Sequence, residues 1–487
     1  MKLEALIHGL DGLEEYEIRG DADKEIGHLT LDNRECVKGS LFFAIRGLET
    51  DGHKYISGAL ANGAAAAVVE EFTSECITQI KVNDSRRAMS LMAAAFYGNP
   101  AQGMSFVGVT GTNGKTSITF MLRHALNKKG LSVGLIGTSG IFINGEKQNI
   151  SIKTSTTPDP IELQYILRRM RDRGVKSVVM EVTAQALYLR KVEGILFDVG
   201  IFTNLTQDHL EFFGDMQTYA EAKLRLFEPG RCKKAVVNID DETGRRAATG
   251  ATTYALDRDA DIKAENIVYS GQGSSFDLIY KGEIYQAKLK ISGRFSVYNA
   301  LAAFGALTAL GLEAQFALKC LGEFPGVPGR FETPDMQGRP YSVVRDYAHT
   351  PDGLENILKA VKNYHKGRII TVFGCGGNRD TGKRPIMGEI AARYSDLCVI
   401  TSDNPRYEEP MEIMRQIEKG LPAGYTNYKM LENRRSAILF AMENAHAGDI
   451  IIIAGKGDED YQEIGGVKHH FSDRETVASL LNENAHL

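Results

Sequence analysis

The chain has 487 residues, of which 43% are hydrophobic and 24% charged, and its formal net charge is −5. This composition is typical of an ordinary globular protein, and the length suggests about three domains rather than one core. The acidic balance argues against nucleic acid as the main partner, and no apolar run is long enough to span a membrane. We therefore expect a cytoplasmic protein without membrane insertion.

The cysteines are scattered along the chain without Cys-x-x-Cys pairs, which predicts reduced thiols and no zinc site. They are Cys36, Cys76, Cys232, Cys320, Cys375 and Cys398.

A first segment, residues 1–100, ends at a cluster of turn-forming residues over 98–103 that predicts a linker. Within this segment the pattern predicts a strand over 41–45, a helix over 56–62 and a strand over 64–69.

The strongest signal begins with the apolar run 106–109, which reads as a buried strand. A loop with two glycines follows, and a helical pattern then runs from Lys115 to a stop at Gly130. This layout is typical of a phosphate cradle, in which loop N–H groups and the helix N-terminus face the anion and Thr116 can ligate Mg²⁺. The strict G-x-x-x-x-G-K-[ST] spacing fails, because Val109 stands where the first glycine would be. The tighter form still predicts a nucleoside triphosphate site, formed by Gly111, Thr112, Asn113, Gly114, Lys115, Thr116 and Ser117.

The second segment, residues 101–330, alternates strands and helices, as a mostly parallel α/β sheet does. Ligands of such sheets bind at the carboxyl ends of strands, so Glu181 and Thr203–Asn204 should lie near the Lys115 loop. The other expected strands cover 133–136, 177–181, 198–202 and 234–238, followed by an antiparallel flap over 261–290 and a helix over 296–311.

The third segment, residues 331–487, predicts a second, Rossmann-like sheet whose polar loops share one edge. Its expected strands cover 343–347, 369–373, 397–401 and 450–453, and the polar loops are Asp346, 374–379, 403–406 and 455–459.

A second chemical signal covers residues 202–227. Asp208–His209 follow a strand, and Asp215 is placed to cap a helix that carries Lys223 among apolar residues. A single histidine or lysine of this kind is usually structural or solvated. Together with Glu181 and the phosphate loop, however, they indicate a second metal site.

These motifs resemble the Mur ligase family, and within it the UDP-N-acetylmuramoyl-tripeptide synthetases. The resemblance covers nearly the whole chain and implies an N-terminal UDP-binding α/β domain, a central P-loop ATPase domain and a C-terminal Rossmann-like domain. It is carried by 111–117, 155–159, 180–182, 203–206, 208–210, 219–227, 298–303, 328–330, 346–351, 373–377, 379–385, 403–406 and 454–457.

The family forms an amide by moving the γ-phosphate of ATP onto a carboxylate, which an incoming amine then attacks. The resemblance implies that the acceptor is UDP-N-acetylmuramoyl-L-Ala-D-Glu and that the added amino acid is meso-diaminopimelate. It also implies two Mg²⁺ ions, with CO₂ carried as a carbamate on Lys223. We also expect a monomer.

The family positions fall on four groups of residues. The catalytic and metal-binding positions correspond to Lys115, Thr116, Glu181, His209 and Lys223. The remaining ATP positions correspond to Asn299, Arg330, Asp346 and His349. The UDP-substrate positions correspond to Asn33, Thr156, Thr157, Thr183 and Lys191. The diaminopimelate positions correspond to Arg379, Asp403, Asn404, Pro405, Arg406, Gly455 and Glu459.

Three departures from the family pattern concern substrate contacts. Thr183-Ala184-Gln185 replaces Ser-Ser-His, and Lys191 replaces an arginine while Arg190 stands one place early. Asn33 and Asp458 replace the usual serine and histidine. None of these changes touches the phosphate or metal set.

Three alternatives stay open. A lysine-adding ligase and a folylpolyglutamate synthetase share the reaction class, although the segment 32–53 resembles a uridine-nucleotide domain and speaks against the folate enzyme. A non-catalytic binding protein on the same fold would be expected to lose some catalytic positions, and this chain keeps Lys115, Glu181, His209 and Lys223.

Overall fold

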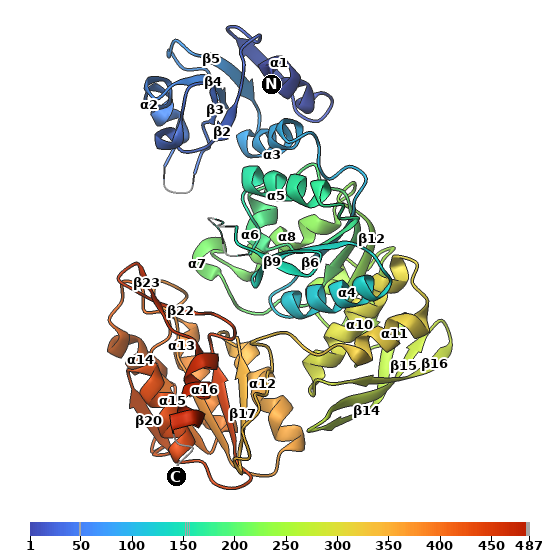
Figure 1. Ribbon diagram of the computed structural model, residues 1–487, viewed down its shortest axis with the longest axis vertical. Coiled ribbons are helices and arrows are strands. Elements are labelled where there is room, and N and C mark those ends of the chain that lie inside the picture. Colours follow the sequence, from blue (N-terminus) through green and yellow to red (C-terminus); the bar gives the residue numbers. More distant parts are fainter. Residues whose placement is uncertain (48–49, 151, 153, 155, 484–487) are drawn as a thin grey trace. The chain divides into compact units, whose positions relative to one another are not determined.

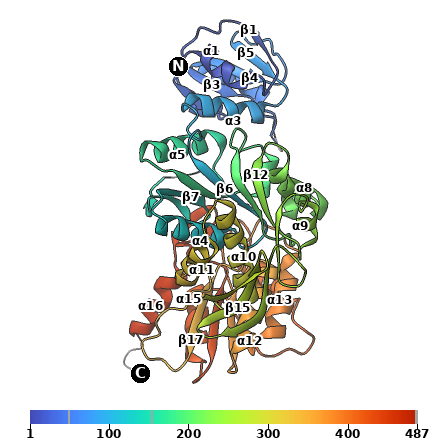
Figure 2. The same ribbon diagram turned by 90° about the vertical axis from the view of Figure 1, so that its right-hand side faces the viewer.

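A computed structural model of the chain describes residues 1–47, 50–150, 152, 154 and 156–483. Ser155, the first residue of one of the family motifs, lies outside them. The described chain, drawn in Figures 1 and 2, divides into two compact units. The first unit comprises 1–110, 126–200 and 222–234, and the second comprises 111–125, 201–221 and 235–487. Among the described residues, no helix combines the length and apolarity needed to cross a membrane.

The first unit begins with a five-stranded sheet in the order β1-β5-β4-β3-β2, in which only β1 is antiparallel. The expected strand over 64–69 is confirmed as β4. The strand expected over 41–45 is shorter, because the Ile45 N–H bonds back to the Phe43 carbonyl and the chain turns there. The elements are α1 Leu3–Ile7, η1 His8–Leu10, β1 Tyr16–Arg19, β2 His28–Thr30, η2 Asn33–Glu35, β3 Ser40–Phe43, η3 Gly52–Tyr55, α2 Ile56–Ala61, β4 Ala64–Val69, β5 Thr78–Val82 and α3 Ser85–Phe96.

Both faces of this sheet are covered. Leu41 and Phe43 of β3 pack with α1 and α3, whereas Phe42 and Ala44 pack with α2 on the other face. This split follows from the two-residue side-chain period of a strand. Strands β3 and β4 are therefore nearly continuous apolar runs, as strands covered on both faces are.

The rest of the first unit contains the strand that leads to the phosphate loop. β6, β10 and β7 are parallel, with Glu181 opposite Val109, and β8 and β9 continue from β7 as antiparallel strands. The expected strands over 106–109, 133–136 and 177–181 are confirmed. The elements are β6 Ser105–Thr110, β7 Val133–Gly137, β8 Gly140–Ile143, β9 Glu146–Gln148, α5 Pro160–Asp172, β10 Ser177–Glu181 and α6 Ala184–Tyr188.

Four elements have residues in both units: α4 Lys115–Lys128, β11 Phe197–Phe202, α8 Met216–Leu224 and β12 Cys232–Asn238. The helix expected from Lys115 and the strands expected over 198–202 and 234–238 are confirmed in type and place.

The second unit contains the expected flap, an antiparallel meander of β14, β15 and β16, and the expected helix over 296–311 is α10. The elements of this part are α7 Leu210–Phe213, α9 Glu242–Arg246, β13 Thr252–Ala255, β14 Ile262–Ser270, β15 Gly273–Tyr280, β16 Glu283–Leu289, α10 Arg294–Ala309 and α11 Ala314–Glu323. The short helix η4 Arg225–Phe227 belongs to the first unit.

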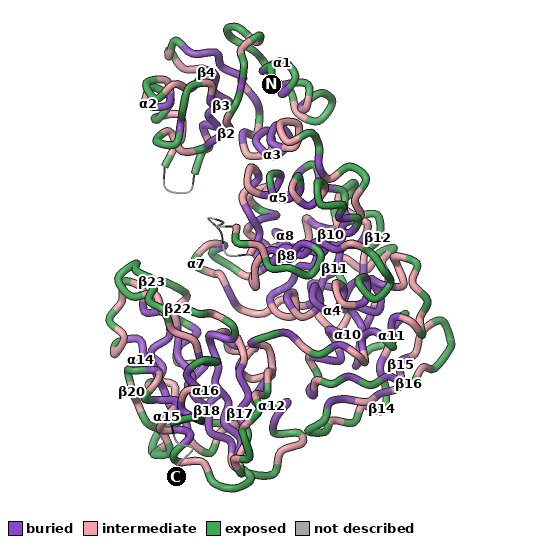
Figure 3. Tube along the Cα trace, viewed as in Figure 1, coloured by how far each residue is buried: buried purple, intermediate pink, exposed green. Residues whose placement is uncertain are grey.

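The C-terminal part is a five-stranded, fully parallel sheet in the order β17-β21-β18-β19-β20. Helices α12, α13 and α14 cover one face and α15 and α16 the other, and the central strands are buried (Figure 3). The elements are β17 Ser342–Asp346, α12 Pro351–Tyr364, β18 Ile369–Phe373, α13 Lys383–Tyr394, β19 Leu397–Thr401, α14 Pro410–Glu418, β20 Tyr428–Leu431, α15 Arg434–Glu443, β21 Ile450–Ala454, β22 Tyr461–Ile464, β23 Val467–His470 and α16 Asp473–Glu483.

Candidate active site

The glycine loop has the backbone that a phosphate cradle requires. Gly111 and Gly114 have φ of +145° and +89°, a region that L side chains rarely adopt. A Cβ on Gly111 would overlap the Thr203 hydroxyl, and one on Gly114 would lie 2.5 Å from the Asn299 Oδ1. Lys115 Nζ donates to the carbonyls of Gly111 and Thr112, both at 2.9 Å. The Lys115 ammonium therefore lies over the glycine loop, where the phosphates are predicted to bind.

Residues after β11 hold this loop in place. The Asn113 N–H donates to Asn204 Oδ1 at 2.9 Å, and the Thr203 hydroxyl donates to the Asn113 carbonyl at 2.7 Å. Asn113 Nδ2 also donates to the Asp352 carboxylate at 2.5 Å. The expectation that Thr203–Asn204 lie beside the phosphate loop is confirmed.

Arg330, a predicted nucleotide contact, lies against Thr116, and Asp346, a second predicted contact, interacts with Arg330. Arg330 Nη2 donates to Thr116 Oγ1 at 3.3 Å, and the guanidinium lies 4.1 Å from the centre of the Tyr347 ring. Asp346 accepts hydrogen bonds from the N–H groups of Phe331 and Ala348 at 2.7 and 2.8 Å. Burial raises the pKa of Asp346, with Arg330 acting in the opposite direction.

A cluster of charges surrounds Asp208 and His349. Desolvation, reinforced by the charge of Lys383, lowers the pKa of His349 to about 4. Burial alone would raise the pKa of Asp208, but His209, His349 and Lys383 outweigh it and lower that pKa. His349 is therefore neutral near pH 7 and Asp208 is ionised. Lys383 was not among the residues predicted from the sequence, although it lies in the family motif over 379–385.

His209 sits at the start of α7 in the left-handed region, with φ of +56°. Its ring lies 3.4 Å from an Asp208 carboxylate oxygen and 3.6 Å from one of Glu211. The neighbouring Gln207 donates to Asp380 Oδ2 at 3.1 Å.

Glu181, at the end of β10, is 1% exposed. Its carboxylate accepts hydrogen bonds from the N–H and the hydroxyl of Thr138 at 3.0 and 3.1 Å. The Thr138 hydroxyl also lies 3.0 Å from that of Thr156, and the Thr157 hydroxyl donates to the Glu181 carbonyl at 3.0 Å. The Thr183 N–H donates to the Thr157 hydroxyl at 3.1 Å. Four predicted site residues of the first unit thus form one hydrogen-bonded group.

The other predicted residues of this unit have separate surroundings. Lys191 Nζ pairs with Asp159 Oδ1 at 2.7 Å, and the Asn33 carbonyl accepts from Asn62 Nδ2 at 2.9 Å. Lys223 is 1% exposed. Within the described ranges, no three or more His, Cys, Asp or Glu side chains are grouped so as to hold a metal ion.

The polar loops of the C-terminal sheet meet at one edge, as expected. Lys456 Nζ donates to Asn404 Oδ1 at 3.0 Å, and Asn404 Nδ2 donates to Glu459 at 3.1 Å. Gly455 has φ of +121°, and a Cβ there would lie 2.7 Å from Asp403 Oδ2. Burial raises the pKa of Glu459, and the charge of Asp403 adds to this effect.

Arg406 is held on two sides, and sequence reasoning did not foresee its acidic neighbour. Its Nε lies 3.2 Å from Glu463 Oε2, and its Nη1 donates to the Gly377 carbonyl at 2.9 Å. The Arg406 N–H also donates to the Glu463 carbonyl at 2.9 Å. Arg379, by contrast, is exposed.

The chain has a glycine loop of the phosphate-binding kind at the end of a parallel strand, and a second parallel sheet. These features are typical of nucleotide-binding α/β proteins. Three family models match the chain: "Mur ligase family, catalytic domain" over residues 25–97, "Mur ligase middle domain" over 109–307, and "Mur ligase, glutamate ligase domain" over 329–457. The chain belongs to the Mur ligase family, which confirms the resemblance found in the sequence.

Its relatives have similar lengths. A UDP-N-acetylmuramoyl-L-alanyl-D-glutamate–2,6-diaminopimelate ligase of Clostridioides difficile is 44% identical, covering 99% of this chain and 100% of the relative. The ligase of that name from Clostridium botulinum is 42% identical, covering 96% and 98%. A solved structure of a ligase of that name is 30% identical with a TM-score of 0.70, covering 100% of both chains.

Proposed function

We propose that this protein is an ATP-dependent ligase that joins meso-2,6-diaminopimelate to UDP-N-acetylmuramoyl-L-Ala-D-Glu, in the cytoplasmic synthesis of peptidoglycan precursors. The observation that carries this proposal is identity of 42–44% with ligases of that name along nearly the whole length of both chains.

In the proposed reaction, ATP transfers its γ-phosphoryl group to the terminal carboxylate of the D-glutamate. The amine of diaminopimelate attacks the resulting acyl phosphate, the amide forms, and inorganic phosphate leaves. The N–H groups of the glycine loop and Lys115 bind the phosphates. Lys115 exchanges the carbonyls of Gly111 and Thr112 for phosphate oxygens when the nucleotide enters. Asn299, Arg330, Asp346 and His349 bind the rest of the nucleotide.

The oxygen donors of the site suit Mg²⁺, which prefers carboxylate and hydroxyl ligands. Thr116 and Glu181 would hold one ion, and His209 and Lys223 a second. Lys223 fits this role only as a carbamate, because an ammonium would repel the metal. When bound, Mg²⁺ would reduce the repulsion between the triphosphate and the carboxylate.

We propose the following division of the chain. Residues 1–100, with Asn33, bind the uridine nucleotide together with Thr156, Thr157, Thr183 and Lys191, and residues 101–330 carry ATP. Residues 331–487 bind the incoming amino acid, through Arg379, Asp403, Asn404, Pro405, Arg406, Gly455 and Glu459. The protein acts as a monomer.

The test is ADP release by the purified protein with ATP, Mg²⁺ and the UDP-dipeptide, against a panel of amino acids. Turnover should occur with meso-diaminopimelate and not with L-lysine, and Lys115→Ala should abolish it. Equal turnover with lysine would leave the ligase assignment intact and refute the choice of amino acid. Absence of ADP release with every amino acid would refute the ligase assignment.

A further inference from the structure

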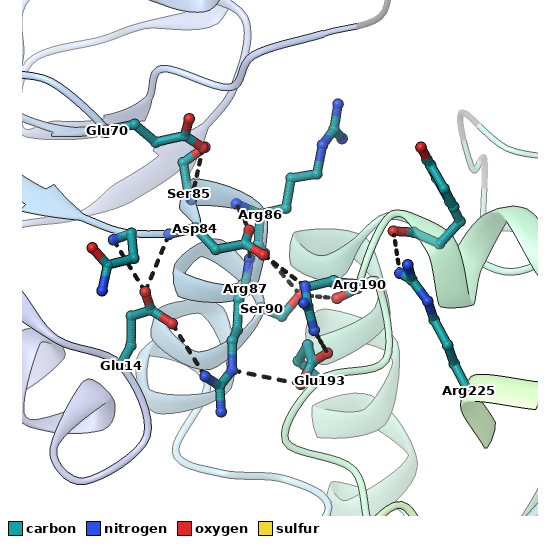
Figure 4. Close-up of polar contacts among 12 residues, drawn as sticks. Glu14, Glu70, Asp84, Ser85, Arg86, Arg87, Ser90, Arg190, Glu193 and Arg225 are labelled. Atoms are coloured by element: carbon teal, nitrogen blue, oxygen red, sulfur yellow. Dashed lines mark hydrogen bonds and ion pairs between the residues drawn. The ribbon is translucent and has the colours of Figure 1, made fainter. Parts of the chain in front are cut away.

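A network of ion pairs joins helix α3 to the turn that follows α6 (Figure 4). Arg190 lies at its centre. The Arg190 Nε lies 2.6 Å from Asp84 Oδ2, and its Nη1 donates to Glu193 Oε1 at 3.2 Å. The Arg190 carbonyl accepts a hydrogen bond from the Ser90 hydroxyl at 2.7 Å. Side chain and backbone of one residue are thus both fixed against α3.

Glu193 is the shared partner of three guanidinium groups. Its side chain is only 7% exposed and is paired with Arg190, Arg87 and Arg231. Arg87 also lies 3.3 Å from Glu14. With Asp84 and Glu14, the three carboxylates balance the three guanidinium groups. Removing one of these partners would leave the largely buried Glu193 carboxylate with less compensating charge, so each guanidinium constrains the position of Glu193.

The backbone at Arg190 directs the chain toward a predicted substrate contact. Arg190 has φ of +56°, in the left-handed region that disfavours residues with a Cβ. The next N–H, that of Lys191, donates to the Ala186 carbonyl at 2.8 Å and closes the end of α6. Lys191 then pairs with Asp159 at 2.7 Å. The contacts of the Arg190 side chain offset the unfavourable backbone of a turn that places Lys191.

A cavity of about 560 Å³ borders these ion pairs, lined by residues 12–15, Asn83, Asp84, Arg87 and Arg190. Six of its eight lining residues have charged or amide side chains, so water can occupy the space left by a shortened side chain. A substitution at Arg190 should therefore loosen the turn without opening a dry void in the core.

We propose that Arg190 is a positioning residue for the uridine-nucleotide substrate, an inference that rests on the proposed function. Paired with Asp84 and Glu193, Arg190 fixes the turn after α6. Lys191, in this turn, and Thr183, directly before α6, therefore contact the substrate in one arrangement. The partners of Arg190 (Asp84, Glu193 and Ser90) are not among the residues predicted to bind ATP or the incoming amino acid. Loss of Arg190 should therefore weaken binding of one substrate only.

The test compares Arg190→Gln with the conservative Arg190→Lys and with Arg168→Gln as a matched control. Arg168 forms an exposed ion pair with Asp172 on α5. Arg190→Gln should raise the KM for the UDP-dipeptide by about tenfold and leave the KM for ATP and kcat within about twofold. Arg190→Lys should recover part of the loss because it keeps one charge, and Arg168→Gln should match the wild type. Calorimetry with the UDP-dipeptide alone should show equal affinity for the wild type and Arg168→Gln, a lower affinity for Arg190→Lys and the lowest for Arg190→Gln.

If the wild type turns over the substrates and Arg190→Gln leaves the KM for the UDP-dipeptide unchanged, the positioning role is refuted. A wild type without turnover would refute the proposed function instead. Should Arg190→Gln fail to fold, Asp84→Asn breaks the same pair while its amide oxygen can still cap α3 through the N–H groups of Arg86 and Arg87. An unchanged KM for the UDP-dipeptide in Asp84→Asn would then refute the proposal, and a rise like that expected for Arg190→Gln would support it.

Discussion

Among single residues, burial decides what the charged groups of the site can do. Lys223 is 1% exposed on α8, and the family resemblance predicts that its amine carries CO₂ as a carbamate, an anion that attracts a metal ion. Lys223→Ala should lose most of the ligase activity, and short carboxylates such as acetate should partly restore it by supplying the missing oxygens.

The activity of Lys223→Ala is measured by ADP release with and without added acetate. Lys233→Ala is the control, because Lys233 is an exposed partner of Asp198. Full activity of Lys223→Ala would contradict the carbamate assignment.

We propose that Arg406 selects the amino acid, because its guanidinium can pair with the distal carboxylate of diaminopimelate, which lysine lacks. Losing such a contact costs on the order of 2–5 kcal/mol. Arg406→Ala should raise the KM for diaminopimelate by more than about tenfold and leave the KM for ATP nearly unchanged. Steady-state kinetics measure both, and Arg435→Ala, at an exposed ion pair with Glu483, is the control. A parallel rise in both KM values would indicate general damage rather than a lost contact.

His349 makes stability depend on pH. Its pKa in the folded protein is about 4, lowered by desolvation from the ordinary value of 6.5. Between these two values the unfolded chain binds a proton that the folded chain does not. The free energy of unfolding therefore falls as the pH drops from 6.5 to about 4. Asp346 acts in the opposite direction, because burial raises its pKa.

Urea unfolding of wild type and His349→Gln at about pH 7 and about pH 4.5 measures this effect. The variant should lose less stability on acidification than the wild type. His8→Gln should lose more stability on acidification than the wild type. In the wild type the hydrogen bond between His8 and Asp11 raises the pKa of His8 in the folded protein, which stabilises the fold at acid pH, and the variant lacks this contribution. Equal acid losses in wild type and His349→Gln would refute the assignment.

Between elements, a close contact between two helices of the C-terminal layer depends on a glycine. Gly388 of α13 faces the end of α14, and a Cβ there would overlap the Ile417 carbonyl oxygen. Gly388→Ala must separate the two helices, which should lower the free energy of unfolding by about 1–3 kcal/mol. Urea unfolding tests this, with Gly271→Ala as control because its Cβ would only reach ordinary contact with Tyr364 at 3.9 Å. Equal stability of the two variants would show that the helices adjust without cost.

For the whole molecule, the proposed reaction requires ligand-driven closure. The predicted ATP, UDP-substrate and amino-acid residues are distributed over different parts of the chain, and hinged enzymes of this kind close when their ligands bind. Small-angle scattering should show compaction when an ATP analogue and the UDP-dipeptide are both present, compared with either ligand alone. An unchanged profile would indicate a rigid enzyme that is already closed.

The sequence by itself determined the elements that continuous patterns encode. The strands over 369–373 and 397–401 appear with the predicted bounds, because strands buried on both faces form uninterrupted apolar runs between polar loops. The glycine loop and the helix from Lys115 were equally readable, since their spacing is local. The short strands β1 and β20 were missed, because an edge strand that is largely exposed or only half-buried lacks such a run.

Only the tertiary structure decided which charges meet. Glu463 lies 57 positions after Arg406, and Arg190 lies 106 positions after Asp84. Nothing in the local sequence links the members of either pair. Their partners are set by how helices and strands pack, because an ion pair depends on a separation of a few ångströms that distance along the chain does not encode. The family and its chemistry follow from short motifs, whereas the contacts that orient Arg406 and Arg190 follow from the fold.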